Sequence, residues 1–245
     1  MSHAQAADGP RLAPGEWVAE AKAATRRWAT VLLIGVGCGV VVTGVLSRLV
    51  MLLLAELNPE AAGVRSDDGF IMGQITLSGS TQLALSGAQL GAIGAFLYMA
   101  LRGLMIGPPW FRLLSISVGP GVVVGATLVH TTGIDFHLLH PLWLTIGSFV
   151  LLPVAFCAAM HLIAEWALSH GGVRSMPLQV LGVTLSIVTL PLTLALSTGW
   201  LIARAFRGDD ALSTTSAAWF VRALLAFVFV MAVIDLVSDA RTLST

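Results

Sequence analysis

The chain has 245 residues, of which 56% are hydrophobic and only 11% are charged, and its mean hydropathy is +0.88. In soluble domains roughly a quarter of all residues are charged, so this composition indicates a protein whose solvent is lipid. A formal net charge of zero argues against nucleic acid as a partner. Cys38 and Cys157 both lie in apolar stretches and predict neither a disulfide framework nor a CxxC metal site.

Apolar stretches long enough to cross a bilayer, which needs roughly 20 residues each, recur along the chain. The sequence therefore predicts an all-α integral membrane protein, a polytopic bundle of about six transmembrane helices. We expect a cytoplasmic N-terminal segment over residues 1–27, a transmembrane domain over 28–238 and a C-terminal tail over 239–245. The predicted spans cover residues 28–55, 80–102, 110–129, 141–166, 177–203 and 217–237.

The N-terminal segment has two open interpretations. Residues 14–27 form either a short amphipathic helix lying on the membrane surface or a loosely ordered tail. In the first span, Gly35 and Gly39 make a small-xxx-small pair, which predicts that another helix approaches closely there.

The second predicted span carries two different faces. Gln82 and Gln89 fall on a polar face, whereas Gly87 and Gly91 fall on a small-residue face roughly opposite. This pattern predicts a helix at the centre of the bundle. Two interpretations of its polar face stay open. The face lines a path for a ligand or a proton, or it makes interhelical hydrogen bonds.

The third predicted span contains Gly119-Pro120-Gly121, which predicts an interruption of the helix. Broken helices form binding sites in transporters, but a proline also produces simple packing kinks, so both interpretations stay open.

A polar stretch over residues 129–141 joins the third and fourth predicted spans and holds His130, Asp135, His137 and His140. Imidazole and carboxylate groups suit Zn, Cu, Fe or Ni, so this outer-face loop is a candidate site for a metal ion. The HxxH spacing matches no dedicated metal motif, and a polar interfacial loop or a proton-handling role are the alternatives.

His161 and Glu165 lie one helical turn apart near the other end of the fourth predicted span. They form a candidate proton relay, or they only make hydrogen bonds at the membrane boundary. About 31 Å of helix separates His161 from His140, so the two regions cannot share a site. We expect Arg222 at the outer interface, paired with Asp135 or with an acidic residue of the 56–68 connection.

Basic residues near the predicted helix ends favour a cytoplasmic N-terminus, in what we expect to be a bacterial inner (plasma) membrane. Walker, dinucleotide, HExxH and GxSxG motifs are absent, so the sequence does not favour an enzyme. The leading interpretation is an accessory or structural subunit that contacts other membrane subunits, or itself, through its helices. A small-solute transporter or channel and a metal-binding membrane protein are the alternatives.

Overall fold

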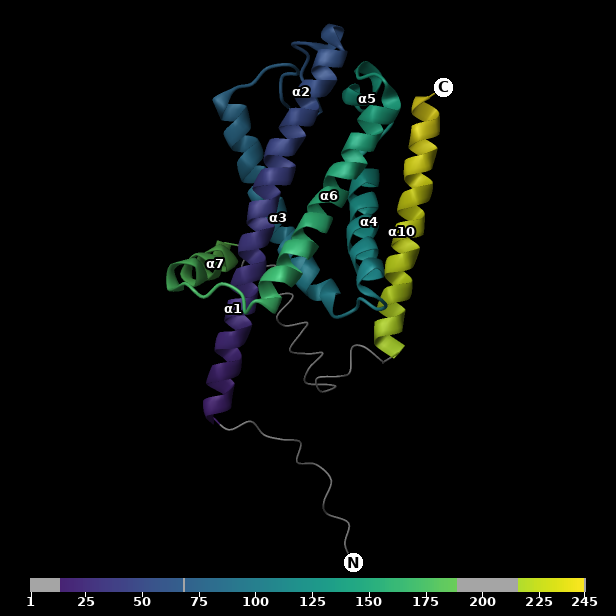
Figure 1. Ribbon diagram of the computed structural model, residues 1–245. Coiled ribbons are helices and arrows are strands. Elements are labelled where there is room, and N and C mark those ends of the chain that lie inside the picture. Colours follow the sequence, from purple (N-terminus) through teal and green to yellow (C-terminus); the bar gives the residue numbers. More distant parts are fainter. Residues whose placement is uncertain (1–13, 68, 189–215, 245) are drawn as a thin grey trace, which may run out of the picture.

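The computed structural model describes residues 14–67, 69–188 and 216–244. The first ascending helix consists of three consecutive elements, which are α1 (Pro14–Cys38), a π-helical stretch η1 (Gly39–Leu46) and α2 (Ser47–Leu57). Residues 14–27 are therefore the first turns of the spanning helix and extend in line with it beyond the bundle (Figure 1). Both interpretations of this segment, a separate surface helix and a loose tail, are wrong.

The next helices alternate in direction between two ends of the bundle (Figure 1). We call the end where α1 begins the lower end, and the end where α2 stops the upper end. Thr76 caps the descending helix by accepting a hydrogen bond from the Gly79 amide at 3.1 Å. In chain order the elements are α3 (Leu77–Arg102), α4 (Pro109–Leu128), the short α5 (Ile134–Leu138) and α6 (Leu142–Ser169).

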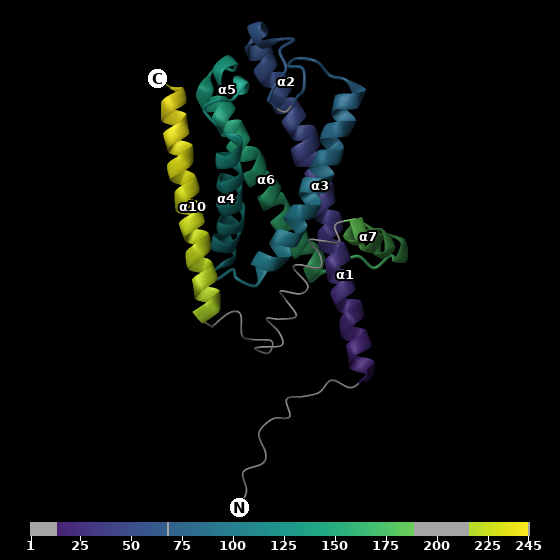
Figure 2. The ribbon, with the colours of Figure 1, turned by 180° about the vertical axis from the view of Figure 1, so that it is seen from behind.

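Two further helices complete the described structure. Helix α7 (Met176–Val188) lies across the lower end and packs on α1, as Figures 1 and 2 both show. Residues 189–203, the rest of the fifth predicted span, lie outside the described residues. Helix α10 (Ser216–Leu243) then runs from the lower to the upper end and packs on α4.

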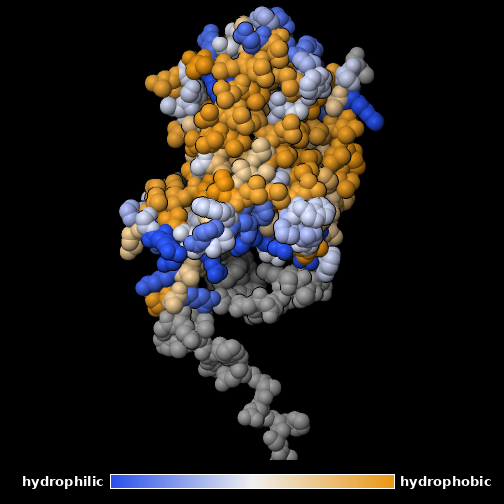
Figure 3. Space-filling view, viewed as in Figure 1, coloured by the Kyte–Doolittle hydropathy of each residue, from blue (hydrophilic) through white to orange (hydrophobic). Residues whose placement is uncertain are grey.

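Five of the described helices are long and apolar enough to cross a membrane. Figure 3 shows an apolar surface around the middle of the molecule, with polar residues gathered towards its two ends. This distribution matches a bilayer core between two aqueous interfaces. The chain is therefore an all-α, multi-pass membrane protein, and the predicted fold class is confirmed.

The Gly119-Pro120-Gly121 motif does not interrupt its helix. Helix α4 runs unbroken from Pro109 to Leu128 with Pro120 inside it. A Cβ atom on Gly121 would lie 2.8 Å from Cα of Val154 on α6, so this glycine lets the two helices pack closely. The expected interruption is wrong, and the motif serves helix packing.

The closest helix crossing lies between α3 and the first ascending helix, near the junction of α1 and η1. A Cβ atom on Gly39 would lie 2.8 Å from Cα of Gly91, and one on Gly35 would run into the Gly91 carbonyl oxygen. Gly87 faces Gly39 in the same way. The close approach predicted from Gly35 and Gly39 is confirmed, and the small-residue face of α3 is its partner.

The larger of two clusters of buried apolar side chains among the described residues lies in the lower half of the bundle, where α1, α3 and α6 meet. Phe96 of α3 is fully buried and its ring lies 5.1 Å from that of Trp28 on α1. Leu32 and Met160 belong to the same cluster. Burial of several large side chains at this level holds three helices together.

Arg222 lies at the lower end of α10 and not at the upper end. Its Nε donates a 2.9 Å hydrogen bond to the carbonyl oxygen of Leu104, in the turn between α3 and α4. Its guanidinium also lies over the Trp219 ring at 4.9 Å. The expected pairing of Arg222 with Asp135 is wrong, because α10 ascends where the six-span prediction has it descend.

We predict that Gly39→Ala and Gly91→Ala each lower the melting temperature of the purified protein in detergent. Each added methyl group meets backbone atoms that cannot move independently, at a cost of about 1–3 kcal/mol. Gly37→Ala is the matched control, because a Cβ atom there meets nothing within 4 Å. Equal melting temperatures for all three variants would refute the role of the crossing.

Candidate functional site

A cavity of about 650 Å³ lies between α3 on one side and α4 and α6 on the other, with residues of η1 and α2 completing its wall. This volume falls in the range of about 300–1,000 Å³ that small-molecule sites occupy. Along α3 the lining extends from Gln82 to Leu101, which is about 28 Å of helix. The cavity therefore spans nearly the full thickness of a hydrocarbon core, about 30 Å.

The two faces of α3 explain where this cavity lies. The glycine face packs against η1, so residues such as Ser86, Ile93 and Leu97 face the cavity on the opposite side. Helix α4 packs along α6 through Gly121 and Gly125 and does not close over this face. Contact between α3 and α6 occurs lower down, where a Cβ atom on Gly94 would lie 2.6 Å from the Phe156 ring.

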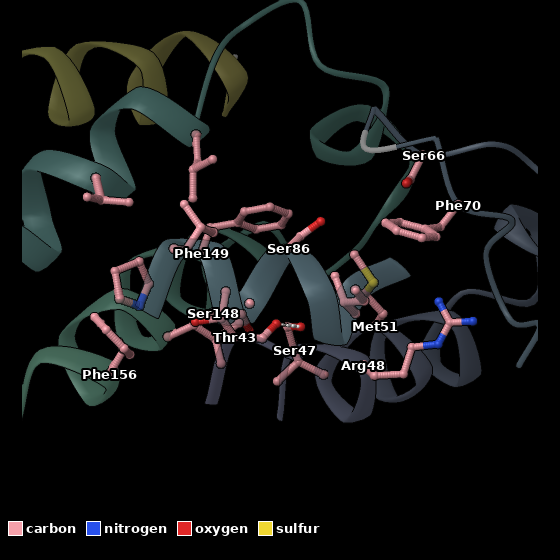
Figure 4. Close-up of a pocket in the computed structure, with 18 of the residues that line it drawn as sticks. Thr43, Ser47, Arg48, Met51, Ser66, Phe70, Ser86, Ser148, Phe149 and Phe156 are labelled. Atoms are coloured by element: carbon pink, nitrogen blue, oxygen red, sulfur yellow. Dashed lines mark hydrogen bonds between the residues drawn. The ribbon is translucent and has the colours of Figure 1, made fainter. Parts of the chain in front are cut away.

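The cavity lining is mainly apolar, although several hydroxyl groups belong to it. Ser47 donates to the Thr43 carbonyl oxygen and Ser148 donates to that of Leu144, so both hydroxyl protons bond within their own helices. Figure 4 shows Phe149 and Phe156 towards one side of the cavity, and Ser66, Phe70 and Arg48 towards the other. The arrangement suits an apolar molecule with a polar group at one end.

A second polar group, the lower-end cluster of Tyr98, Arg102, His161 and Glu165, joins α3 to α6. Tyr98 Oη donates to Glu165 Oε1 at 2.6 Å, while Arg102 donates to both carboxylate oxygens at 2.6 and 3.1 Å. The Arg102 and Glu165 side chains are 39% and 40% exposed, so water weakens their attraction, and we expect a stabilisation of roughly 0.2–1 kcal/mol. Tyr98 also lines the cavity, so this cluster marks the cavity's lower limit.

His161 packs edge-on against the Tyr98 ring, with 5.8 Å between the ring centroids. Its buried Nδ1 has no hydrogen-bond partner among the described residues. The hydrogen bonds of Glu165 in this part of the chain come from Tyr98 and Arg102 instead. The structure thus places His161 and Glu165 in one cluster without joining them in a direct relay.

The other two residues of the predicted ligand or proton path lie elsewhere. Gln82 lines the upper part of the cavity, about 24 Å of helix above Tyr98. Gln89 is exposed and does not contribute to the cavity wall. The four predicted residues therefore do not form one continuous path.

The histidine-rich stretch caps the upper end. His130 Nδ1 contacts Thr132 Oγ1 at 3.2 Å, and His137 Nε2 contacts the Thr131 carbonyl oxygen at 2.9 Å. The buried Asp135 uses its backbone amide to donate to Asp67 Oδ2 at 3.3 Å.

His140 reaches across to α2 through its backbone. Its amide donates to Asn58 Oδ1 at 2.8 Å, and its carbonyl oxygen accepts from Asn58 Nδ2 at 2.9 Å. Asn58 is 2% exposed, and its Nδ2 also donates to the Leu54 carbonyl oxygen at 2.8 Å. The two bonds with His140 join residues 82 positions apart, so no local sequence pattern indicates them.

Metal ligation needs several of these side chains to converge on one point. Among the described residues, no group of three or more His, Cys, Asp and Glu side chains is placed to hold a metal ion. The structure therefore does not bring His130, Asp135, His137 and His140 together as a ligand set. The metal hypothesis stays a prediction from the sequence.

Comparison of the chain with family models, curated protein sequences and solved structures finds no match.

Proposed function

We propose that the protein binds a lipid-like molecule inside the membrane and handles it as a transporter or carrier does. The observation that carries this proposal is the cavity of about 650 Å³ between α3 and the α4–α6 pair. Its mainly apolar lining and its length, close to that of the hydrocarbon core, favour a long apolar chain over a hydrated solute. If the protein is a transporter, the molecule it carries is therefore an amphiphile that enters from the bilayer.

Contacts at the lower end support the same interpretation. The bonds from Tyr98 and Arg102 to Glu165 hold α3 against α6 where the cavity ends. A ligand chain would therefore enter between the helices above these bonds and end near Tyr98 and Leu101.

We predict that Leu152→Trp prevents ligand binding, because Leu152 lines the cavity and the larger indole occupies its volume. The measurement is photo-crosslinking of a diazirine-bearing single-chain phospholipid to the protein in nanodiscs, with crosslinks mapped to α3 and α6 residues. Cavity crosslinks should fall about tenfold, the change that about 1.4 kcal/mol produces.

Leu151→Trp is the matched control, since Leu151 is 64% exposed and does not line the cavity. Crosslinks that spread evenly over the apolar surface, or that fall equally in both variants, would eliminate the proposed ligand site.

An accessory subunit remains a second candidate because of α10. This helix packs mainly on α4, and only 6% of its spanning window is buried. Asp235 is exposed on it and is flanked by the apolar Ile234 and Leu236. A carboxylate facing lipid is unfavourable, so a basic group of another subunit would stabilise it.

We predict that Asp235→Asn releases a membrane subunit that co-purifies with the wild-type chain, because the substitution removes the charge that attracts a basic group. Affinity purification from mild detergent, followed by mass spectrometry of the bound polypeptides, measures this. Asp239→Asn, close to the end of α10, should retain the partner. Identical polypeptides from all three preparations would exclude a partner held by Asp235.

We propose that the lower end faces the cytoplasm of a bacterial cell. Seven basic residues of the described ranges lie at this end and three lie at the upper end, an asymmetry typical of the cytoplasmic side. The lower set is Lys22, Arg26, Arg27, Arg102, Arg112, Arg174 and Arg222, and the upper set is Arg48, Arg65 and Arg241.

We predict that Glu60→Cys reacts with a membrane-impermeant maleimide in intact cells, whereas Lys22→Cys reacts only after permeabilisation. Both positions are exposed, and Lys22 lies in α1 at the lower end whereas Glu60 lies just beyond α2 at the upper end. The background should carry Cys38→Ser and Cys157→Ser. The reverse labelling pattern would place the N-terminus outside.

A further inference from the structure

We propose that the upper end of the cavity is a binding site for the phosphate group of a phospholipid, held by Arg48 and Ser66. This inference rests on the proposed lipid-like ligand and adds the chemistry of its polar end. The acyl chain would lie along the apolar lining between α3 and α6, while the phosphate would lie beside α2 and the connection that follows it.

Ser66 provides the first observation. Its side chain lines the cavity and is only 8% exposed, and its buried Oγ has no hydrogen-bond partner among the described residues. The backbone holds it in place, because the Ser66 amide donates to the Phe70 carbonyl oxygen at 2.8 Å. Figure 4 shows the hydroxyl directed towards the cavity. A buried hydroxyl fixed in this way is an unused hydrogen-bonding group.

Arg48 provides the second observation from a different element. Its Nη2 donates to the Gln74 carbonyl oxygen at 2.6 Å, and its guanidinium lies 5.7 Å from the centre of the Phe70 ring. These contacts orient the side chain at the cavity wall, yet its buried Nε finds no partner in the described part of the chain. Arg48 and Ser66 thus both flank Phe70, each with a free donor.

Two free donors, one of them on a cation, call for an anionic oxygen. Guanidinium groups bind phosphate with charge-assisted hydrogen bonds, and a hydroxyl can add another donor to the same group. Arg48 lies about 30 Å of helix above Trp28, which places it at the level of lipid headgroups if Trp28 lies at the opposite interface. Phospholipid is the phosphate source that a cavity between spanning helices meets directly.

The acidic groups nearby restrict where the phosphate can lie. Asp135 of α5 also lines the cavity, and Asp67 accepts a hydrogen bond from its amide. Both carboxylates repel an anion, so the phosphate would lie nearest the positive charge of Arg48.

The test is native mass spectrometry of the full chain in detergent, titrated with lysophosphatidylglycerol and with a monoacylglycerol of the same chain length. The wild-type chain should bind the phospholipid about tenfold more tightly, the scale of one charge-assisted hydrogen bond. Arg48→Gln and Ser66→Ala should each remove most of this preference without changing monoacylglycerol affinity. Arg65→Gln, an exposed charge at the same end that does not line the cavity, should leave the preference unchanged.

Melting curves establish that each variant is folded, and Ser66→Ala, which deletes a single oxygen atom, keeps the test decisive if Arg48→Gln is unstable. Equal wild-type affinity for the two lipids would overturn the phosphate site while leaving the lipid-like ligand in place. Failure of both lipids to bind would remove the proposed function as well. Competition by inorganic phosphate at similar concentration would show that the donors serve free anions and would overturn the phospholipid assignment.

Discussion

The close crossing between the first ascending helix and α3 is the contact on which the remaining arrangement depends. Gly35 and Gly39 face Gly87 and Gly91 so closely that any side chain would meet backbone. Lipid tails offer no hydrophobic driving force between helices, so this intimate packing supplies much of the attraction. It also fixes the rotation of α3, and thereby determines that the residues opposite its glycine face border the cavity.

The cavity follows from joining two tightly packed helix pairs mainly at one end. Helix α3 packs against α1 and η1, and α4 packs against α6 through Gly121 and Gly125. The pairs are linked low in the bundle, by Phe96 and Met160 in the core and by Arg102 with Glu165 at its edge. Above these links α3 lies apart from α4 and α6, and the space between them carries the proposed ligand function.

Two kinds of polar residue lie at the upper end, those whose polar groups have hydrogen-bond partners and those with a donor left over. Asn58 bonds both backbone groups of His140, and the ring nitrogens of His130 and His137 contact neighbouring oxygens of their own stretch. These groups support the cap, which must satisfy its backbone away from regular helix. Ser66 and Arg48 keep buried donors free beside the cavity. This difference between satisfied and free groups favours the Arg48 side, and not the histidine stretch, as the place for a ligand.

Local pattern in the sequence was enough to identify a helical membrane protein, the close approach at Gly35 and Gly39, and the shared helix face of His161 and Glu165, because spacing along one helix decides these features. It could not reveal that α4 continues through Pro120, since tolerance of an internal proline depends on what packs around it. Nor could it place Arg222, whose end of the membrane depends on the direction of α10. The meeting of Arg48 with Phe70, and of Tyr98 with Glu165, joins residues far apart in the chain. Only helix packing in three dimensions decides such contacts, because no periodic pattern connects residues on different helices.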